Sequence, residues 1–378
     1  MSETVRIESV SFAVVEVTAR TTWTFAGFRD VGGLETLVEI TSGDNTKAVV
    51  ATLFEAVTTL STRELSSEAD VLPSLGLTAV DVTGKQALEM AVSALRTATA
   101  QLQATRSGQS LTRFLGGEDV ESILLYANVN RHLLTRDRSP RAFADAAKLA
   151  VQRGFEIVKC APFDEASPPS SVEAIFETAG PGIERVAAIR EAVGPGVRLL
   201  VDCHSRFEVH TAPLVAAELV KLDIGWFEEP VSPTEDTSAL SSIAEKVSMP
   251  VAGGESGYGR TFFDGLIKRN AVSIIMPDVK YCGGVVEACR AGISATRSGA
   301  GVSFHSPSGP ISLLASAHVT AAVEGAMPLE HAVYEADWRA DLIQPRERIE
   351  RGRLWFAGGP GLGAVLNDDV VNRHGRRF

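Results

Sequence analysis

Three short stretches of the chain decide the fold: RLLVDC (198–203), IGWFEE (224–229) and PVAGGE (250–255). Each is apolar like a buried strand and ends at or near an acidic residue, which gives Asp202, Glu228 and Glu255. These acids are 26 and 27 residues apart, about the length of one strand, one helix and two loops. Nearly equal steps of this length predict a (β/α) barrel in which the three carboxylates lie side by side at one mouth.

The chain continues this rhythm from about Glu121 onward. Eight strand candidates are apolar nearly throughout, as expected for strands buried on both faces. They are SILLYANV (122–129), FEIVKCA (155–161), VRLLVDC (197–203), IGWFEE (224–229), PVAGGE (250–255), VSIIMPD (272–278), GVSFH (301–305) and MPLEHAV (327–333). Seven helix candidates lie between them, at 141–153, 183–193, 211–222, 238–247, 262–269, 284–298 and 311–323. Eight βα units are the number that closes a barrel. A doubly wound open sheet is the structural alternative.

The first 118 or so residues have a different pattern. VRIESVSFAVVEV (5–17) alternates like a strand, ETLVEITSG (35–43) reads as an edge strand, and apolar residues recur at helical spacing from about Lys85 to Thr105. Strands followed by helices are typical of an α+β unit. RGRLWFAGGPGLGAVLNDDVV (351–371) is Gly-rich and does not extend the βα rhythm. We therefore expect it to pack back on the first unit.

Composition excludes several classes of protein. The chain has 378 residues, of which 45% are hydrophobic and 22% charged, as in ordinary globular proteins. A formal net charge of −11 argues against binding to nucleic acid or to an anionic membrane. No apolar run is long enough to span a membrane, and MSETVRIESV (1–10) lacks a signal pattern. Four cysteines without a CxxC pair predict reduced thiols in a cytoplasmic protein.

The three acids at the strand ends predict a metal site. Convergent carboxylates repel one another unless a cation lies between them. Oxygen ligands with few neighbouring thiols or imidazoles favour Mg²⁺ over Zn²⁺. Glu229 follows Glu228, and strand alternation points it to the other face. We assign the ligand to Glu228, and the expected set is Asp202, Glu228 and Glu255.

Further candidates surround this set. His204 lies two residues after Asp202, so strand alternation turns both side chains the same way; a structural hydrogen bond is the competing role for this histidine. His305 and Asp278 end neighbouring strands, and an Asp beside a His gives a plausible general base. Lys159 ends the second strand, where it can act in acid–base chemistry or neutralise the acids. Lys280 is expected to face solvent.

Taken together, these motifs resemble the enolase superfamily, in the mandelate racemase/muconate lactonizing enzyme-like group and closest to galactonate- and mannonate-type sugar-acid dehydratases. The resemblance runs almost the full length. It is carried by FLGG (114–117), VDCHSR (201–206), WFEEP (226–230), GGES (253–256), MPDVKYCGG (276–284), FHSPSGP (304–310), PLEHAV (328–333) and PGLG (360–363).

The resemblance implies a (β/α)7–8 TIM-type barrel with an N-terminal α+β capping domain. Residues 1–118 would form the cap and substrate lid, 119–345 the catalytic barrel, and 346–378 a segment returning to the cap. TTWTFAGFRDVGG (21–33) is the candidate lid loop. A dimer or octamer of identical chains is common among such proteins.

It also implies roles for individual residues. Mg²⁺ would bind Asp202, Glu228 and Glu255; His305 and Asp278 would form the base; Glu330 would hydrogen-bond the substrate carboxylate; and His204 would be the general acid. Arg206 would contact the substrate or support the loop. The expected activity is Mg²⁺-dependent dehydration of a sugar acid, a carboxylate small molecule, to a 2-keto-3-deoxy acid.

One departure from the family pattern bears on the reaction. Many relatives carry Lys-x-Lys on the second strand, but here Ala161 takes the place of the second lysine. This loss disfavours a racemase or epimerase, which needs bases on both faces of the α-carbon. Two more functions compete with dehydration: a Schiff-base aldolase using Lys159 and a non-catalytic binder of sugar acids.

Overall fold

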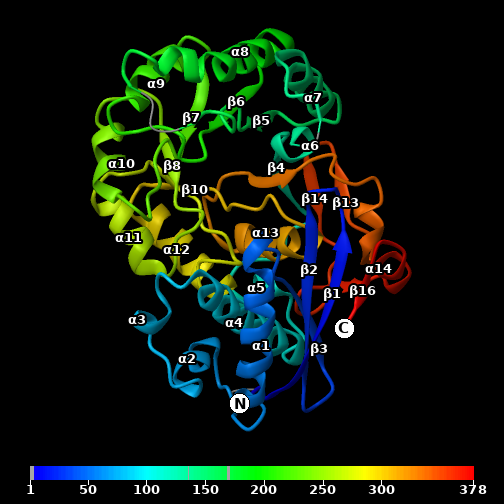
Figure 1. Ribbon diagram of the computed structural model, residues 1–378. Helices are drawn as coiled ribbons and strands as arrows, with labels where there is room; N and C mark the ends of the chain where they lie inside the picture. The colour runs from blue at the N-terminus through cyan, green and yellow to red at the C-terminus, as the bar shows by residue number, and fades with distance from the viewer. Residues whose placement is uncertain (1–3, 135, 168–170) are drawn as a thin grey trace.

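The computed structural model describes residues 4–134, 136–167 and 171–378. The chain begins with three antiparallel strands and a set of helices that form the lower part of Figure 1. The strands are β1 (Ile7–Glu16), β2 (Thr22–Asp30) and β3 (Glu35–Glu39), joined at the edge by the C-terminal β16 (Gly375–Arg377) in the order β16-β1-β2-β3. The helices are α1 (Thr46–Leu60), α2 (Val71–Ser74), α3 (Ala79–Val82), α4 (Gln86–Arg106) and α5 (Leu111–Phe114).

Parallel strands alternating with helices form the rest of the molecule. The strands are β4 (Ser122–Asn128), β5 (Ile157–Cys160), β6 (Arg198–Asp202), β7 (Ile224–Glu228), β8 (Val251–Gly253), β9 (Ile274–Ile275), β10 (Gly301–Val302) and β11 (Leu329–Ala332). The helices are α6 (Asn130–Leu133), α7 (Pro140–Gln152), α8 (Ile175–Val193), α9 (Ala212–Val220), α10 (Thr237–Ala244), α11 (Arg260–Lys268), α12 (Val285–Arg297) and α13 (Pro310–Ala322). Every strand and helix predicted from the βα rhythm is present in the described part of the chain.

The strands follow the order of a barrel. Pairing runs from β10 through β9, β8, β7, β6, β5 and β4, and β11 pairs with β4. No strand pairing joins β10 to β11 in the described residues, but Met327 N donates to Val302 O at 2.9 Å across this seam. The Ser303 hydroxyl also donates to Pro328 O at 3.0 Å. The arrangement is a (β/α) barrel of the TIM type with an N-terminal α+β cap (Figure 1).

Local sequence explains these elements. Strand β6 is RLLVD, and all but its first residue are buried, as expected for a parallel strand covered on both sides. Helix α7 begins with Pro140 after Ser139, whose side chain accepts a hydrogen bond from Ala142 N. Its buried face consists of Phe143 and alanines, and these small side chains bring the helix close to the sheet.

The prediction of a lid loop at 21–33 is wrong, because most of this segment is strand β2. Thr22–Asp30 pairs with β1 on one side and β3 on the other. A central strand is buried on both faces, so its polar alternation is weak and the sequence pattern hides it. The chain instead turns between Val17 and Thr21, where Val17 N donates to Thr21 O at 2.9 Å.

The C-terminal segment makes contact with both parts of the molecule. Strand β14 (Arg353–Trp355) pairs antiparallel with β4, and β13 (Arg348–Glu350) pairs antiparallel with β14. The chain then passes through α14 (Asp368–His374) and adds β16 to the cap sheet. The short strands β12 (Ile343–Gln344) and β15 (Val365–Leu366) pair with each other. No helix in the described ranges is long and apolar enough to cross a membrane.

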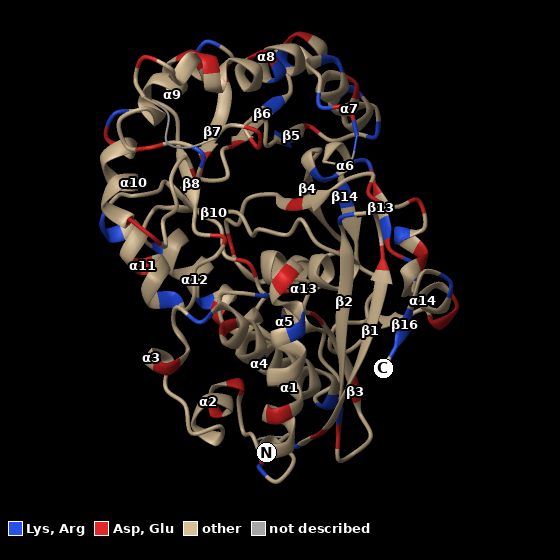
Figure 2. Ribbon diagram, viewed as in Figure 1, with Lys and Arg blue, Asp and Glu red and all other residues tan. Residues whose placement is uncertain are grey.

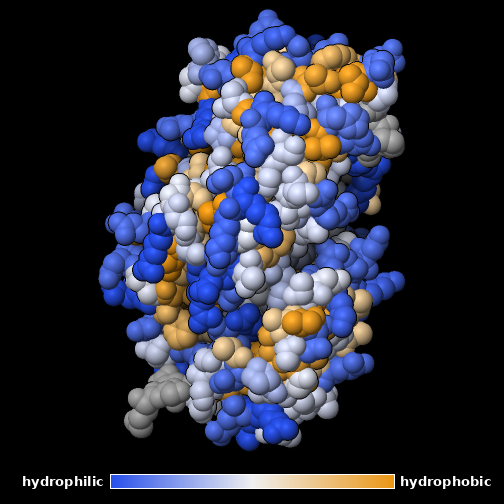
Figure 3. Space-filling model, turned by 90° about the vertical axis from the view of Figure 1, so that its left-hand side faces the viewer, coloured by the Kyte–Doolittle hydropathy of each residue, from blue (hydrophilic) through white to orange (hydrophobic). Residues whose placement is uncertain are grey.

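The surface is polar and mixed in charge. Acidic and basic residues are interspersed along the ribbon in Figure 2. The face shown in Figure 3 is mostly hydrophilic, with apolar side chains scattered over it.

His318 on α13 contacts both α5 and the C-terminal segment. Its Nε2 lies 3.2 Å from Leu362 O in the C-terminal segment, and its Nδ1 lies 2.8 Å from the Thr112 hydroxyl on α5. A neutral ring satisfies both contacts, with Nε2 donating and Nδ1 accepting. The ring is buried, and burial lowers the pKa of His318 to about 4.

We expect the free energy of unfolding to fall by about 3 kcal/mol between pH 6.5 and pH 4 because the neutral, buried His318 resists protonation. The unfolded chain takes up this proton at higher pH than the folded protein. The stabilisation is therefore complete above pH 6.5 and is lost as the pH falls. Urea unfolding across this range should show a weaker pH dependence for His318→Gln than for the wild type. The exposed His210→Gln is the matched control, and equal slopes for His318→Gln and wild type would contradict the assignment.

Candidate active site

A layer of apolar side chains fills the barrel beneath the site. Tyr126, Leu200 and Trp226 point into the barrel from β4, β6 and β7, and their cluster is fully buried. Tyr126 and Trp226 meet edge to face with ring centroids 5.6 Å apart. Because side chains alternate along a strand, the residue two positions after each of them faces the same interior. The next layer toward the mouth therefore begins with Asn128, Asp202 and Glu228.

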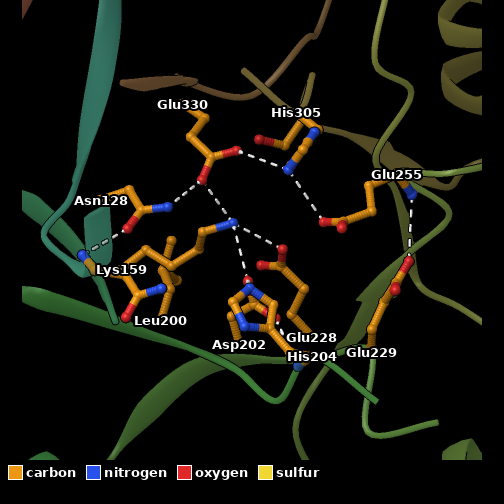
Figure 4. Close-up of polar contacts among 12 residues, drawn as sticks. Asn128, Lys159, Leu200, Asp202, His204, Glu228, Glu229, Glu255, His305 and Glu330 are labelled. Atoms are coloured by element: carbon orange, nitrogen blue, oxygen red, sulfur yellow. Dashed lines mark hydrogen bonds and ion pairs between the residues drawn. The ribbon is translucent and has the colours of Figure 1, made fainter. Parts of the chain in front are cut away.

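The three predicted metal ligands come together in this upper layer. Asp202, Glu228 and Glu255 each offer one oxygen, and these atoms lie within 4.8 Å of one another. Trp226 Nε1 donates to Glu228 Oε2 at 2.8 Å and orients that carboxylate. Glu229 points elsewhere and accepts hydrogen bonds from the backbone N–H groups of Gly254 and Glu255 at 2.8 and 3.2 Å. It braces the loop that carries Glu255 (Figure 4).

The electrostatics of this set favour a bound cation. Burial and the charge of Asp202 raise the pKa of Glu228 well above its ordinary value, although the Lys159 ammonium lies 2.7 Å away. Burial and the neighbouring charge thus disfavour the ionised form of Glu228, and a divalent cation would relieve the same repulsion. Three carboxylates without thiol or imidazole ligands fit Mg²⁺.

Lys159 lies at the centre of the carboxylates. Its Nζ is 2.7 Å from both Glu228 and Glu330 and 3.6 Å from Asp202. Burial lowers the pKa of Lys159, but the charges of Glu228 and Glu330 raise it well above its ordinary value. The side chain is therefore an ammonium ion that neutralises part of the acidic layer.

Glu330 on β11 is held from three sides. Asn128 Nδ2 donates to it at 2.7 Å, Ser306 N donates at 3.0 Å, and Lys159 contacts it at 2.7 Å. Its side chain has no exposed surface. These bonds fix one carboxylate oxygen toward Lys159 and the other toward His305, which lies 3.9 Å away.

His305 and Asp278 form a hydrogen-bonded pair. His305 Nδ1 lies 2.8 Å from Asp278 Oδ2, so Nδ1 donates to this carboxylate and Nε2 is turned away from it. That nitrogen faces the acidic layer, 3.1 Å from Glu255. Burial lowers the pKa of His305, but the charges of Glu255 and Glu330 and the bond to Asp278 raise it overall.

His204 lies beside Asp202, as predicted, but the backbone geometry that brings it there differs from the prediction. Strand β6 ends at Asp202, and His204 has a left-handed backbone with φ of 46°. Its Nδ1 is 2.5 Å from Asp164 and its Nε2 is 3.1 Å from Asp202. A turn, rather than strand alternation, thus brings His204 beside Asp202. Burial lowers the pKa of His204, but Asp202 and Asp164 raise it well above its ordinary value.

The expectation that Lys280 faces solvent is wrong. Its side chain is 4% exposed, and Nζ lies 3.0 Å from Asp278 and 2.7 Å from the Ser308 hydroxyl. Lys280 comes after the end of β9, where strand alternation no longer predicts direction. Tyr281 N and Cys282 N both donate to Asp278 O, and this turn folds Lys280 back over the carboxylate.

Sequence reasoning missed Asn128, Asp164 and the bracing role of Glu229. Asn128 ends β4 two residues beyond the inward-facing Tyr126, and that parity was a usable signal. Asp164 follows β5 in the run FEIVKCAPFD (155–164). An acidic residue shortly after a strand end was the signal that could have identified it. The place of Glu229 depends on a backbone with φ of 34°, which the sequence does not reveal.

Comparison with known proteins places this arrangement in a family. A family model described as "Enolase C-terminal domain-like" matches residues 142–370. The matched region begins in helix α7 and contains the three acids, the His305–Asp278 pair and Glu330.

Relatives with known names match parts of the chain. A D-xylonate dehydratase of Haloferax volcanii is 34% identical over 192 residues, 51% of this chain and 46% of that protein. A D-galactarolactone cycloisomerase of Agrobacterium fabrum is 29% identical over 305 residues, 76% of this chain and 75% of that protein. The chain spans about half the length of the first relatives it matches.

A solved structure matches nearly the whole chain. It is a member of the enolase superfamily from Salmonella Typhimurium, with a TM-score of 0.87 and 21% identity over 99% of both chains. At this identity the likeness establishes the fold alone.

We expect Mg²⁺ to raise the thermal unfolding midpoint of the protein, because a cation that binds only the folded chain stabilises it by about 3 kcal/mol at a hundred times its Kd. Differential scanning fluorimetry with and without Mg²⁺ measures this shift. Glu255→Gln should abolish it, whereas Glu218→Gln on the exposed face of α9 should retain it. A full shift in Glu255→Gln would place the ion elsewhere.

Proposed function

The chain belongs to the enolase C-terminal domain-like family, and on this premise we propose that it is a carbon–oxygen lyase that dehydrates a sugar acid. The observation that carries the proposal is the placement of two histidines around one acidic layer. His305 and His204 lie on different sides of Lys159 and the carboxylates in Figure 4. One can remove a proton while the other delivers one.

His305 is the base in this proposal. Because Nδ1 donates to Asp278, a neutral ring presents the lone pair of Nε2 to the acidic layer that this nitrogen faces. There it removes the α-proton of the substrate, which lies next to a carboxylate and is only weakly acidic. Asp278 holds the tautomer and stabilises the imidazolium that forms.

Asp202, Glu228 and Glu255 would hold Mg²⁺ in this reaction. A divalent cation there supplies positive charge that binds the substrate carboxylate and lowers the cost of removing its α-proton. The Lys159 ammonium adds charge from the chain itself. Glu330, buried between Lys159 and His305, would hydrogen-bond the substrate carboxylate in its protonated form, because a carboxylate without a proton can only accept.

His204 is the general acid in this proposal. Asp202 and Asp164 raise its pKa, which favours the protonated ring that a general acid needs. It gives this proton to the β-hydroxyl as the C–O bond breaks, and water leaves. The α-proton stays on His305, and the resulting enol tautomerises to a 2-keto-3-deoxy acid. Asp164 positions the ring from its Nδ1 side.

The contacts of Lys159 disfavour two competing reactions. A racemase or epimerase needs a second base, and a Schiff-base aldolase needs a neutral amine. Lys159 is held as an ammonium by Glu228 and Glu330 at 2.7 Å each. One relative is named a D-galactarolactone cycloisomerase, so isomerisation of a lactone is a reaction that the product assay must distinguish from dehydration. The cytoplasmic location and the assembly of identical chains stay predictions of the sequence, as do the boundaries at 118 and 345.

We expect at least one acid in a stereochemical library of aldonic and aldaric acids to yield a 2-keto product that semicarbazide detects. The reaction should need Mg²⁺ and should stop with EDTA, because a cluster of three carboxylates without a cation repels an anionic substrate. His305→Asn is the inactive control. Activity that survives exhaustive chelation would contradict the proposal. A lactone-derived isomer without a keto product would favour the cycloisomerase.

We expect His204→Asn and His305→Asn to separate the two halves of the reaction. In ²H₂O with the identified substrate, His204→Asn should still exchange the α-proton while dehydration falls by about 10² to 10⁴. His305→Asn should lose both. NMR of recovered substrate and product measures the two rates. Loss of exchange in His204→Asn at unchanged fold would remove this histidine from the role of acid.

A further inference from the structure

Lys280 contacts the His305–Asp278 pair at Asp278 and not at His305 Nε2, which faces Glu255. Its Nζ lies 3.0 Å from Asp278 Oδ2, the same oxygen that accepts the hydrogen bond from His305 Nδ1 at 2.8 Å. The Lys280 backbone N–H donates to the other oxygen, Oδ1, at 2.8 Å. Asp278 is fully buried, so each of its oxygens is satisfied by the chain alone.

When His305 is neutral and ready to accept a proton, no positive charge on its ring stabilises the negative charge of Asp278. His305 must be neutral to accept a proton, and a neutral ring supplies no charge to keep a buried carboxylate ionised. Burial raises the pKa of Asp278, yet the charge of Lys280, the largest opposing influence, together with the contacts of His305 brings it below its ordinary value. A protonated Asp278 would accept less strongly from Nδ1–H and would release the ring from its tautomer.

We propose that Lys280 is a positioning residue that holds Asp278 as a carboxylate while His305 is neutral. The pair is thus a relay of three groups, in which Lys280 acts on His305 only through Asp278. As a contribution to the abstraction of the α-proton, this inference rests on the proposed function.

The same lysine connects the pair to the cap. Lys280 Nζ contacts the Ser308 hydroxyl at 2.7 Å. The next residue, Gly309, donates its N–H to Glu39 of β3 at 2.8 Å, and Ser312 N donates to the same carboxylate at 3.0 Å. Glu39 therefore caps the first turn of α13 from the other part of the molecule. Lys280 lies between two buried acids, which explains why a charged side chain is kept in a site that water does not reach.

A double-mutant cycle tests the relay. With the substrate found by the library screen, Lys280→Met should lower kcat by about 10- to 100-fold and leave KM within about twofold, because Lys280 touches no substrate. In the Asp278→Asn background the same change should have no further effect on kcat. The exposed Lys221→Met is the matched control and should behave as wild type. An additive loss in the double variant would overturn the proposal.

A second measurement needs no substrate, so it stands even if the proposed function fails. In protein with ¹⁵N-labelled histidine rings, the His305 Nδ1–H should give a downfield proton signal that His305→Asn removes. Lys280→Met should weaken or remove this signal, and Lys280→Arg should keep it. An unchanged signal in Lys280→Met would overturn the proposal. If Lys280→Met does not fold, the His305 signal is compared between Asp278→Asn and Asp278→Asn/Lys280→Met. Both proteins lack the charge of Asp278, so the two signals should be the same. A further change in the double variant would overturn the proposal.

Discussion

Each buried carboxylate at the mouth of this barrel needs a cation within a few ångströms if it is to stay charged. Asp202, Glu228 and Glu330 are shielded almost completely from water. Lys159 neutralises part of this layer, and a divalent cation would neutralise the rest. Asp278 has Lys280 as its own counter-charge. This need for a neighbouring positive charge explains the positions of Lys159 and Lys280, each of which lies beside buried carboxylates.

The apolar layer makes that requirement strict. Tyr126, Leu200 and Trp226 close the barrel beneath the acids, so the site cannot draw water from below. In so poorly hydrated a space the field of each charged group is strong, and small displacements change protonation. The hydrogen bonds that orient the acids, from Trp226 to Glu228 and from Asn128 to Glu330, therefore matter as much as the acids themselves.

The cap and the barrel share polar contacts as well as apolar ones. Glu39 of the cap accepts from the first turn of α13, directly after the segment that carries His305. Tyr258, on the loop after Glu255, packs among apolar cap residues. The groups that would hold metal and remove a proton are thus anchored in both parts of the molecule.

The sequence by itself determined the barrel and most of the site. Strand and helix alternation, with acids at equal steps, was enough to bring Asp202, Glu228 and Glu255 to one mouth, because parallel strands end at the same rim. Only the tertiary structure decided the strand β2, the contact of His204 with Asp164, and the burial of Lys280 against Asp278. These depend on backbone turns beyond the strand ends and on packing from both sides, where neither alternation nor spacing predicts the direction of a side chain.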